Sequence, residues 1–306
     1  MPACQPASVQ PHRRGSRDTS VVELVLVGSS PLAQTASLSG TGPDTLVIDA
    51  TKLTFASPLD LAGIVATAHW AASDSIRVTL LLPSDSDAAA YLQRMDVLRQ
   101  MPSRTQILGF VPPDARADRR GSLMEVTALN EKNVNDLSER LGPLVTGIYK
   151  SSSPAAAAAV FRACGELMGN ATEHGSSDHG AFIAAQLHTG TTTEGARLEF
   201  AVCDTGIGIM EHLRGNPMYA HLTRDELAIA MATQAGVSGI ATDGRGNGLS
   251  DAIEDSRHHG RVDLGIRSGR GELLVEGTRS CHTSRKLSRQ DQTSGTWAWL
   301  THRLPA

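Results

Sequence analysis

The chain has few aromatic residues and few cysteines, and it lacks any long apolar run. Aromatic side chains make up 4% of its 306 residues, so aliphatic side chains and alanine must form the core. The four cysteines lack a CxxC pair, which argues against a zinc site or a disulfide framework. No stretch approaches the ~20 apolar residues of a membrane helix, and the N-terminal residues lack the apolar centre of a secretion signal. We therefore expect a reduced cytoplasmic protein that does not enter a membrane.

The charge balance gives no general attraction to polyanions. The formal net charge is −4, with 20% charged and 40% hydrophobic residues. This composition is typical of globular proteins, and the length is enough for two domains with a core each. We expect no direct contact with nucleic acid or with a membrane surface.

Along the first third of the chain, apolar runs typical of buried strands alternate with runs of helical spacing. In chain order, these runs cover residues 21–27, 45–49, 58–72, 76–82 and 86–101. Their alternation predicts a small α/β domain over 21–115, preceded by a disordered leader over 1–20. Residues 116–122 are charged and follow two prolines, which is typical of a linker.

A second α/β domain is predicted over 123–306. Strands are expected at 123–129, 181–187, 198–203, 262–266, 272–276 and 296–303, and helices at 130–149 and 154–174. Residues 210–243 show no strand pattern. The basic stretch 279–295 is expected to be a solvated loop, with contact to an anionic partner as the alternative.

The helix expected at 154–174 carries polar residues within the sequence ELMGNATEH. Glu166 and Asn170 are four residues apart and share a face, and His174 follows one turn later. A carboxylate can orient or deprotonate an attacking hydroxyl, and an amide oxygen suits Mg²⁺. A solvated helix face explains these residues equally well when the stretch is taken alone.

An acidic residue and two glycines follow the strand expected at 198–203, in the sequence DTGIGI. Gly206 and Gly208 allow a tight turn and a close approach of a ligand to the backbone. The carboxylate of Asp204 can accept a hydrogen bond from an exocyclic amine, such as that of adenine. An ordinary Asp-Gly turn is the alternative.

A third motif, GRGNGL, places glycines at alternate positions before a helical pattern. Gly244, Gly246 and Gly248 expose backbone N–H groups, and a helix N-terminus favours phosphate. The spacing is neither the GxxxxGK[ST] phosphate loop nor the dinucleotide fingerprint GxGxxG. By itself the motif also fits a simple turn.

Taken in order, these three motifs resemble the nucleotide site of the GHKL ATPases, a family that includes gyrase, heat-shock chaperone, histidine kinase and mismatch-repair ATPases. The resemblance covers about residues 123–305. It implies a Bergerat-type α/β sandwich, in which helices cover a mixed sheet, with ATP and Mg²⁺ as ligands. It also implies that 210–243 form a lid over ATP.

The resemblance assigns a role to each motif residue. Glu166 would be the general base, Asn170 the Mg²⁺ ligand and His174 a phosphate contact. Asp204 would bind adenine, and Thr296, in GTWAWL, matches a threonine that supports such an aspartate, although a plain strand threonine explains it nearly as well. The glycines would line the base pocket (Gly206, Gly208) and cradle the phosphates (Gly244, Gly246, Gly248).

Within this family, NATEHG is most similar to the anti-sigma serine kinases. The stretch TLVIDATKLTFASPLDLAGIVATA resembles the STAS domain, which is the fold of the antagonists that these kinases phosphorylate. Where such antagonists carry a phosphorylatable serine, this chain has Pro58, and Ser57 is out of register. A structural or docking role is therefore expected for the STAS-like domain. The resemblance suggests an anti-sigma antagonist or a sigma-factor-like protein as the partner, and it is compatible with a homodimer.

Three functions remain open at this point. The first is an ATP-dependent kinase that phosphorylates a partner protein on serine or threonine. The second is an ATP-gated regulatory module or slow ATPase without kinase activity. Binding alone does not need a base, so the presence of Glu166 argues against a module that only binds ATP. The third is a histidine kinase, which requires a phosphoacceptor histidine before the ATP domain. Only His12 and His69 precede residue 174, so this function is disfavoured.

Overall fold

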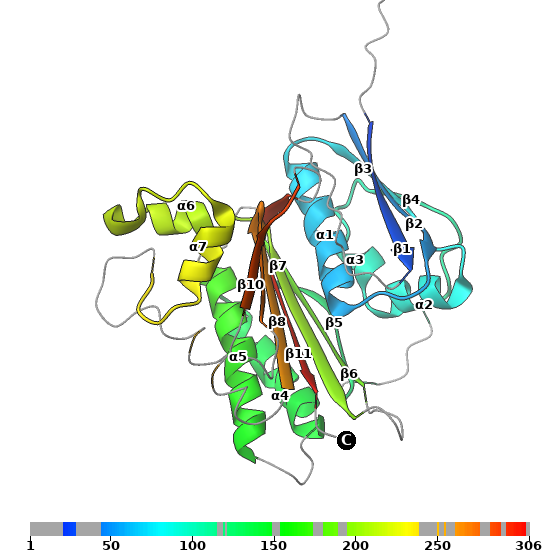
Figure 1. Ribbon diagram of the computed structural model, residues 1–306. Coiled ribbons are helices and arrows are strands. Elements are labelled where there is room, and N and C mark those ends of the chain that lie inside the picture. Colours follow the sequence, from blue (N-terminus) through cyan, green and yellow to red (C-terminus); the bar gives the residue numbers. More distant parts are fainter. Residues whose placement is uncertain are drawn as a thin grey trace, which may run out of the picture.

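The computed structural model describes residues 21–28, 44–114, 119, 121–148, 154–173, 180–188, 195–238, 250, 254, 261–275, 282–288 and 292–303. These residues form an α/β fold with one parallel and one antiparallel sheet (Figure 1). The leader expected at 1–20 lies outside the described residues. No helix in the described part of the chain is both long enough and apolar enough to cross a membrane.

The parallel sheet is built by the N-terminal part of the chain. Its four strands lie in the order β1 (Val21–Gly28), β2 (Thr45–Leu53), β3 (Arg77–Leu81) and β4 (Gln106–Leu108). The first three match the expected strands, whereas the short β4 was not expected. Buried side chains alternate with more exposed ones along β2, as expected for a sheet with one covered face.

Helix α1 (Pro58–Ser73) begins where the sequence predicts, with Pro58 at its first position. Ser57 is the N-cap: its Oγ accepts a hydrogen bond from the Asp60 amide at 3.2 Å, and Asp60 accepts one from the Ser57 amide at 2.8 Å. This reciprocal capping box fixes the start of the helix.

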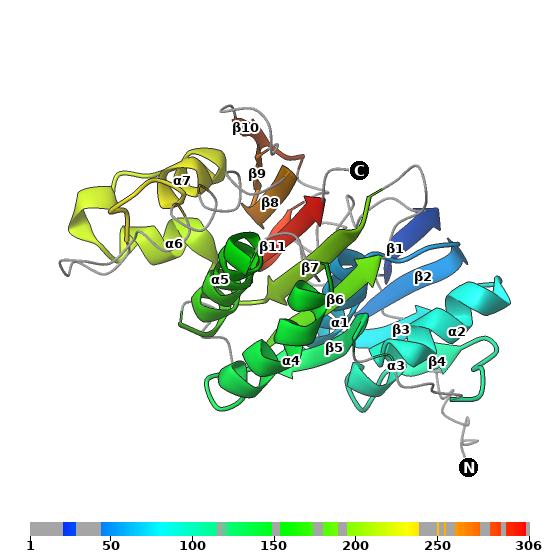
Figure 2. The ribbon, with the colours of Figure 1, turned by 90° about the horizontal axis from the view of Figure 1, so that it is seen from below.

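The helix α1 is buried between the two sheets, as the two views in Figures 1 and 2 show. A single apolar cluster contains Leu46 and Leu80 from the parallel sheet, Ile64 from α1, and Phe182 and Ala201 from the antiparallel sheet. One continuous core therefore joins the N-terminal part of the chain to the remainder.

The single helix expected at 86–101 is wrong, because the chain forms α2 (Ser86–Arg94) and the short α3 (Val97–Gln100) instead. Asp96 interrupts the helix with a left-handed backbone at φ 60°. At this break the Met95 carbonyl accepts a hydrogen bond from the Val126 amide at 3.0 Å. A tertiary contact with the antiparallel sheet therefore takes up a carbonyl that a continuous helix would have used.

The antiparallel sheet has seven strands in the order β10-β9-β8-β11-β7-β6-β5. Their bounds are β5 (Leu123–Leu129), β6 (Ala181–His188), β7 (Arg197–Asp204), β8 (Arg261–Gly269), β9 (Gly271–Val275), β10 (His282–Lys286) and β11 (Thr293–Arg303). The basic stretch expected to be a loop thus contains the edge strand β10, which pairs with β9.

Every pairing between the described strands of this sheet is antiparallel, so the mixed sheet expected from the resemblance is not observed among them. Two helices, α4 (Val134–Ile148) and α5 (Pro154–Glu173), connect the neighbouring strands β5 and β6. Two successive helices return the chain to the end at which β5 stopped. The next strand must therefore run in the opposite direction.

Helices cover the two faces of the antiparallel sheet unequally. The pair α4 and α5 lies on one face and α1 on the other (Figures 1 and 2). Two further helices, α6 (Gly208–Arg214) and α7 (Asp225–Ala232), lie towards β8, β9 and β10, and the 3-10 turn η1 (Pro217–Tyr219) follows α6. Helix α7 covers the apolar run 227–232 within the segment that showed no strand pattern.

Polar contacts attach α7 to the sheet. Asp225 accepts a hydrogen bond from the Arg270 amide at 2.9 Å, and the Glu226 carbonyl accepts one from the Ser284 hydroxyl at 2.8 Å. The Ile229 side chain is fully buried against Leu273 and its neighbours. In the structure, this half of the expected lid is a packed element of the domain.

Candidate functional site

Asp204 ends β7 with its side chain on the face covered by α5. Along β7, Phe200 and Val202 belong to the core under α4 and α5, whereas Ala201 and Cys203 belong to the core around α1. Because side chains alternate along a strand, Asp204 projects to the side of Phe200 and Val202. Only 4% of this residue is exposed.

One carboxylate oxygen of Asp204 is held by the backbone. Asp204 Oδ1 accepts hydrogen bonds from the Gly206 amide at 2.9 Å and from the Thr296 amide at 3.1 Å. The first bond closes the turn after β7, and the second ties β7 to β11. Asp204 Oδ2 has no hydrogen-bond partner within the described part of the chain, so it can accept a bond from a ligand.

Burial controls the protonation of this carboxyl. It raises the pKa of Asp204 to about 6, even though the hydrogen bonds from the Gly206 and Thr296 amides act in the opposite direction. At neutral pH the group is therefore mostly a carboxylate, which can accept but cannot donate a hydrogen bond.

Two glycines with positive φ allow the chain to close tightly around Asp204. At Gly208, with φ 79°, an added Cβ would lie 2.8 Å from Ser268 Oγ. At Gly295, with φ 69°, an added Cβ would lie 2.3 Å from the Asp204 carbonyl oxygen. Both the left-handed backbone and the lack of space require glycine at these positions.

Ser268, on β8, is hydrogen-bonded to residues of α6 and β11. It is 2% exposed, and its Oγ donates a hydrogen bond to the Gly295 carbonyl at 2.9 Å. The same oxygen accepts hydrogen bonds from the Ile209 amide at 2.9 Å and from Thr296 Oγ1 at 3.4 Å. It thus connects the start of α6 to β11.

No sequence pattern marks Ser268, which lies between a strand pattern and a glycine. Gly295 could have been found, because it directly precedes Thr296 in the motif GTWAWL. The structure brings Asp204, Gly206 and Thr296 together through direct hydrogen bonds. It connects Gly208 to the same group by placing it against Ser268.

Glu166 and Asn170 lie on α5, which contacts β7 and β11. The apolar side of this helix, which includes Leu167 and Ala171, is buried in the core, whereas Glu166 is exposed and Asn170 is half-buried. The polar side chains therefore face away from the core, as expected from the spacing.

The end of α5 leads back to the Asp204 end of the sheet. This helix ends at Glu173, and β6 begins at Ala181, which pairs with Asp204. In addition, the Thr205 hydroxyl donates a hydrogen bond to the Gly180 carbonyl at 3.4 Å.

His174, Gly244, Gly246 and Gly248 lie outside the described residues. Their expected contacts with phosphate therefore remain predictions from the sequence.

A magnesium ion would have to rely on few protein ligands. The described residues contain no group of three or more histidine, cysteine, aspartate or glutamate side chains suited to a metal ion. Magnesium sites in nucleotide-binding proteins commonly use one or two protein oxygens together with phosphate oxygens. The Asn170 amide oxygen fits that donor set, provided that a nucleotide supplies the remaining oxygens.

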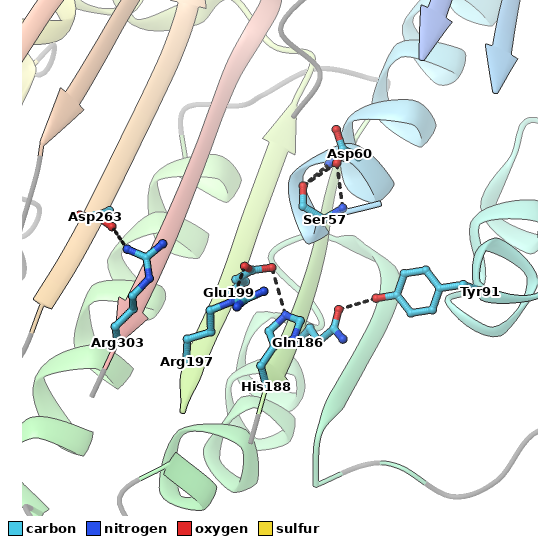
Figure 3. A network of polar contacts seen from close by, with 9 residues as sticks. All are labelled: Ser57, Asp60, Tyr91, Gln186, His188, Arg197, Glu199, Asp263 and Arg303. Atoms are coloured by element: carbon cyan, nitrogen blue, oxygen red, sulfur yellow. Dashed lines mark hydrogen bonds and ion pairs between the residues drawn. The ribbon is translucent and has the colours of Figure 1, made fainter. Parts of the chain in front are cut away.

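The opposite face of the antiparallel sheet carries paired polar groups (Figure 3). Glu199 lies 3.3 Å from His188 Nε2 and 2.9 Å from Arg197 Nε, while Arg303 pairs with Asp263. Burial raises the pKa of Glu199, but the hydrogen bonds and charges of His188 and Arg197 outweigh it and hold the pKa below its ordinary value. These groups satisfy one another and offer no reactive centre.

Comparisons with known proteins found no relative. No family model matches the chain, and no match was found among curated proteins or solved structures.

Proposed function

We propose that this chain binds Mg-ATP in a GHKL-type site and transfers the terminal phosphoryl group to a serine or threonine of a partner protein, in signalling or transcription control. The observation that carries the proposal is the carboxylate of Asp204. One of its oxygens is fixed by two backbone amides, and the other is available on the face that α5 covers. Such an acceptor suits the exocyclic amine of adenine.

The proposed layout has two parts. The parallel sheet with α1, α2 and α3 is the STAS-like part, and the antiparallel sheet with α4 to α7 is the Bergerat-type part. The order of the described elements supports the second assignment: the polar helix α5, then β7 ending in Asp204, then the helical segment α6–α7, precede the strand that carries Thr296.

ATP supplies an activated phosphoryl group and Mg²⁺ neutralises its charge. The partner's hydroxyl oxygen forms the new bond to phosphorus while the bond to the bridging oxygen of ADP breaks. Glu166, which is exposed on α5, accepts the hydroxyl proton. Asn170 would hold the metal, and Asp204 would position the adenine ring.

The STAS-like part has a docking or structural role in this proposal. The Ser57 hydroxyl donates a hydrogen bond to the Asp60 carboxylate at 2.7 Å and caps α1. This engagement supports the view that Ser57 is not the phosphoacceptor of a switch. The partner would be an anti-sigma antagonist or a sigma-factor-like protein.

An ATP-gated regulator without kinase activity is the second candidate. It is favoured by the continuous core around α1, which gives a change at the nucleotide site a direct route to the STAS-like part. The histidine kinase is disfavoured further. The ring of His69 lies 2.8 Å from the Gln100 carbonyl oxygen and 4.7 Å from the Phe182 ring, so it is not a free phosphoacceptor.

Incubation of the purified protein with γ-labelled ATP and cell lysate separates the candidates. A kinase transfers label to a protein, a slow ATPase releases labelled phosphate, and an ATP-gated module does neither while still binding ATP. Label on a serine or threonine that is lost in Glu166→Ala supports the kinase. The absence of both transfer and release, with ATP bound, would favour the gated module.

A further inference from the structure

The hydrogen bonds around Ser268 have a fixed direction. The Gly295 carbonyl can only accept, so the single hydroxyl proton of Ser268 is directed to it, at 2.9 Å. Ser268 Oγ must then act as acceptor for its other two partners. These are the Ile209 amide and the Thr296 hydroxyl.

The direction of these hydrogen bonds determines whether the Thr296 hydroxyl can donate to a ligand or can only accept. Because its hydroxyl proton points to Ser268, Thr296 Oγ1 can offer only its lone pairs to a ligand. The Thr296 amide is bonded to Asp204 Oδ1 at 3.1 Å, so the two side chains are neighbours on adjacent strands. Of the described side chains, Asp204 and Thr296 then present two acceptors to a ligand, Asp204 Oδ2 and Thr296 Oγ1, and neither of the two donates.

We propose that Ser268 is a positioning residue that sets the preference of this site for a 6-aminopurine over a 6-oxopurine nucleotide. The inference rests on the proposed nucleotide-binding function. An exocyclic amine carries two N–H groups, one for each acceptor. A 6-oxo group carries none, and its lone pairs would face those of Asp204 and Thr296. Ser268 acts through the orientation of the Thr296 hydroxyl and does not contact the base itself.

The experiment measures the affinities of the full-length protein for Mg-ATP and Mg-ITP by calorimetry. The wild type, Ser268→Ala, Thr296→Val and the double variant are compared. In Ser268→Ala the Thr296 hydroxyl loses its acceptor and becomes free to donate to a 6-oxo group. We expect the ATP/ITP affinity ratio to fall by roughly two- to tenfold, the effect of one hydrogen bond.

Thr296→Val removes the hydroxyl but keeps the shape of the side chain, and we expect it to lower the ratio as well. The double variant should then fall no further, because both substitutions act on the same hydroxyl. A purely structural role for Ser268 would lower the unfolding midpoint and the fraction of active sites, but it would not change the ratio.

The outcomes separate the two proposals. A wild type that binds neither nucleotide, or binds both equally, contradicts the adenine site itself. A wild type that prefers ATP, with an unchanged ratio in Ser268→Ala or an additive double variant, overturns the role of Ser268 alone. If Ser268→Ala does not fold, an unchanged ratio in Thr296→Val overturns it equally.

Discussion

Cys203 and Asp204 are consecutive residues of β7, yet they lie on opposite faces of the antiparallel sheet. Cys203 is packed in the core around α1, whereas Asp204 points to the side of α5. A single strand thus separates the buried helix of the N-terminal part from the candidate adenine-binding carboxylate. A displacement of β7 on nucleotide binding would directly change its packing against α1.

Nucleotide binding should therefore alter amide exchange in α1. We expect Mg-ATP to slow hydrogen exchange in β7 and in residues 58–73, because both are packed in one core. Strand β4, at the outer edge of the parallel sheet, serves as the internal control and should not respond. Protection that stops at the antiparallel sheet would mean that the two parts act independently.

Gly295→Ala should damage both stability and nucleotide binding. The added Cβ would meet the Asp204 carbonyl at 2.3 Å, and such overpacking costs about 1–3 kcal/mol of the free energy of unfolding. Gly236→Ala is the matched control for stability, since Gly236 has a similar φ of 78° but no atom of the described residues within 4 Å of the added Cβ. It should show only the backbone penalty of about 1–2 kcal/mol.

Urea unfolding and ATP titration of both variants provide the measurements. ATP affinity should fall in Gly295→Ala, and the loss of stability should be larger there than in Gly236→Ala. Equal losses of stability in the two variants would show that the close approach of Gly295 to Asp204 is not important.

The affinity for Mg-ATP should depend on pH through Asp204. Burial raises its pKa from 3.8 to about 6, and only the carboxylate form has both oxygens as acceptors. Affinity should be highest above pH 6 and should fall, by up to about tenfold per pH unit, as the pH drops below 6. The measurement is calorimetry in excess Mg²⁺, which keeps the terminal phosphate of ATP deprotonated. Glu166→Ala is the control and should retain the same profile. A flat profile between pH 5 and 7 would contradict this assignment.

As the pH falls below 6, the affinity for Mg-ATP should fall, whereas the contribution of Asp204 to the free energy of unfolding of the free protein should become more favourable. The folded state binds the Asp204 proton below pH about 6, whereas the unfolded state binds it only below about 3.8. The folded state therefore holds the extra proton between these values. This group destabilises the fold at neutral pH, and its unfavourable contribution is relieved as the pH falls from 6 towards 4.

Local patterns predicted most elements but not those set by distant contacts. Apolar spacing predicted the strands that end at Gly28, Leu129 and Asp204. Proline at a first helical position predicted the helices that start at Pro58 and Pro154. The break at Asp96 was missed because it depends on the bond between Met95 and Val126, which are 31 residues apart.

In the site, residues that belong to a local motif were predictable from the sequence, and residues defined by distant contacts were not. Asp204, Gly206 and Thr296 belong to motifs that can be read along the chain. Ser268 is defined by its hydrogen bonds with Ile209, Gly295 and Thr296, which no local pattern reveals. The strand β10 was missed because its charged residues indicate solvent exposure, and exposed charge is also typical of an edge strand.

Substitutions of Glu166 and Asn170 should affect catalysis and ATP binding separately. A general base acts on the chemical step, whereas a metal ligand acts on the bound phosphates. We expect Glu166→Ala to keep its ATP affinity and to lose turnover by roughly 10²–10⁴-fold. Asn170→Ala should instead lose the Mg²⁺-dependent part of ATP binding. Unchanged turnover in Glu166→Ala would show that this residue is not the base.

The central claim is that Asp204 binds adenine, and calorimetry of Mg-ATP with wild type and Asp204→Asn tests it most directly. Asp263→Asn is the matched control, because Asp263 lies on β8, pairs with Arg303 and belongs to the network on the other face of the sheet. Loss of a charged acceptor should weaken binding by about 1.5–3 kcal/mol, or roughly ten- to a hundredfold, in Asp204→Asn only. Both variants should keep the wild-type circular dichroism spectrum. Equal ATP affinity in wild type and Asp204→Asn, with both proteins folded, would contradict the account.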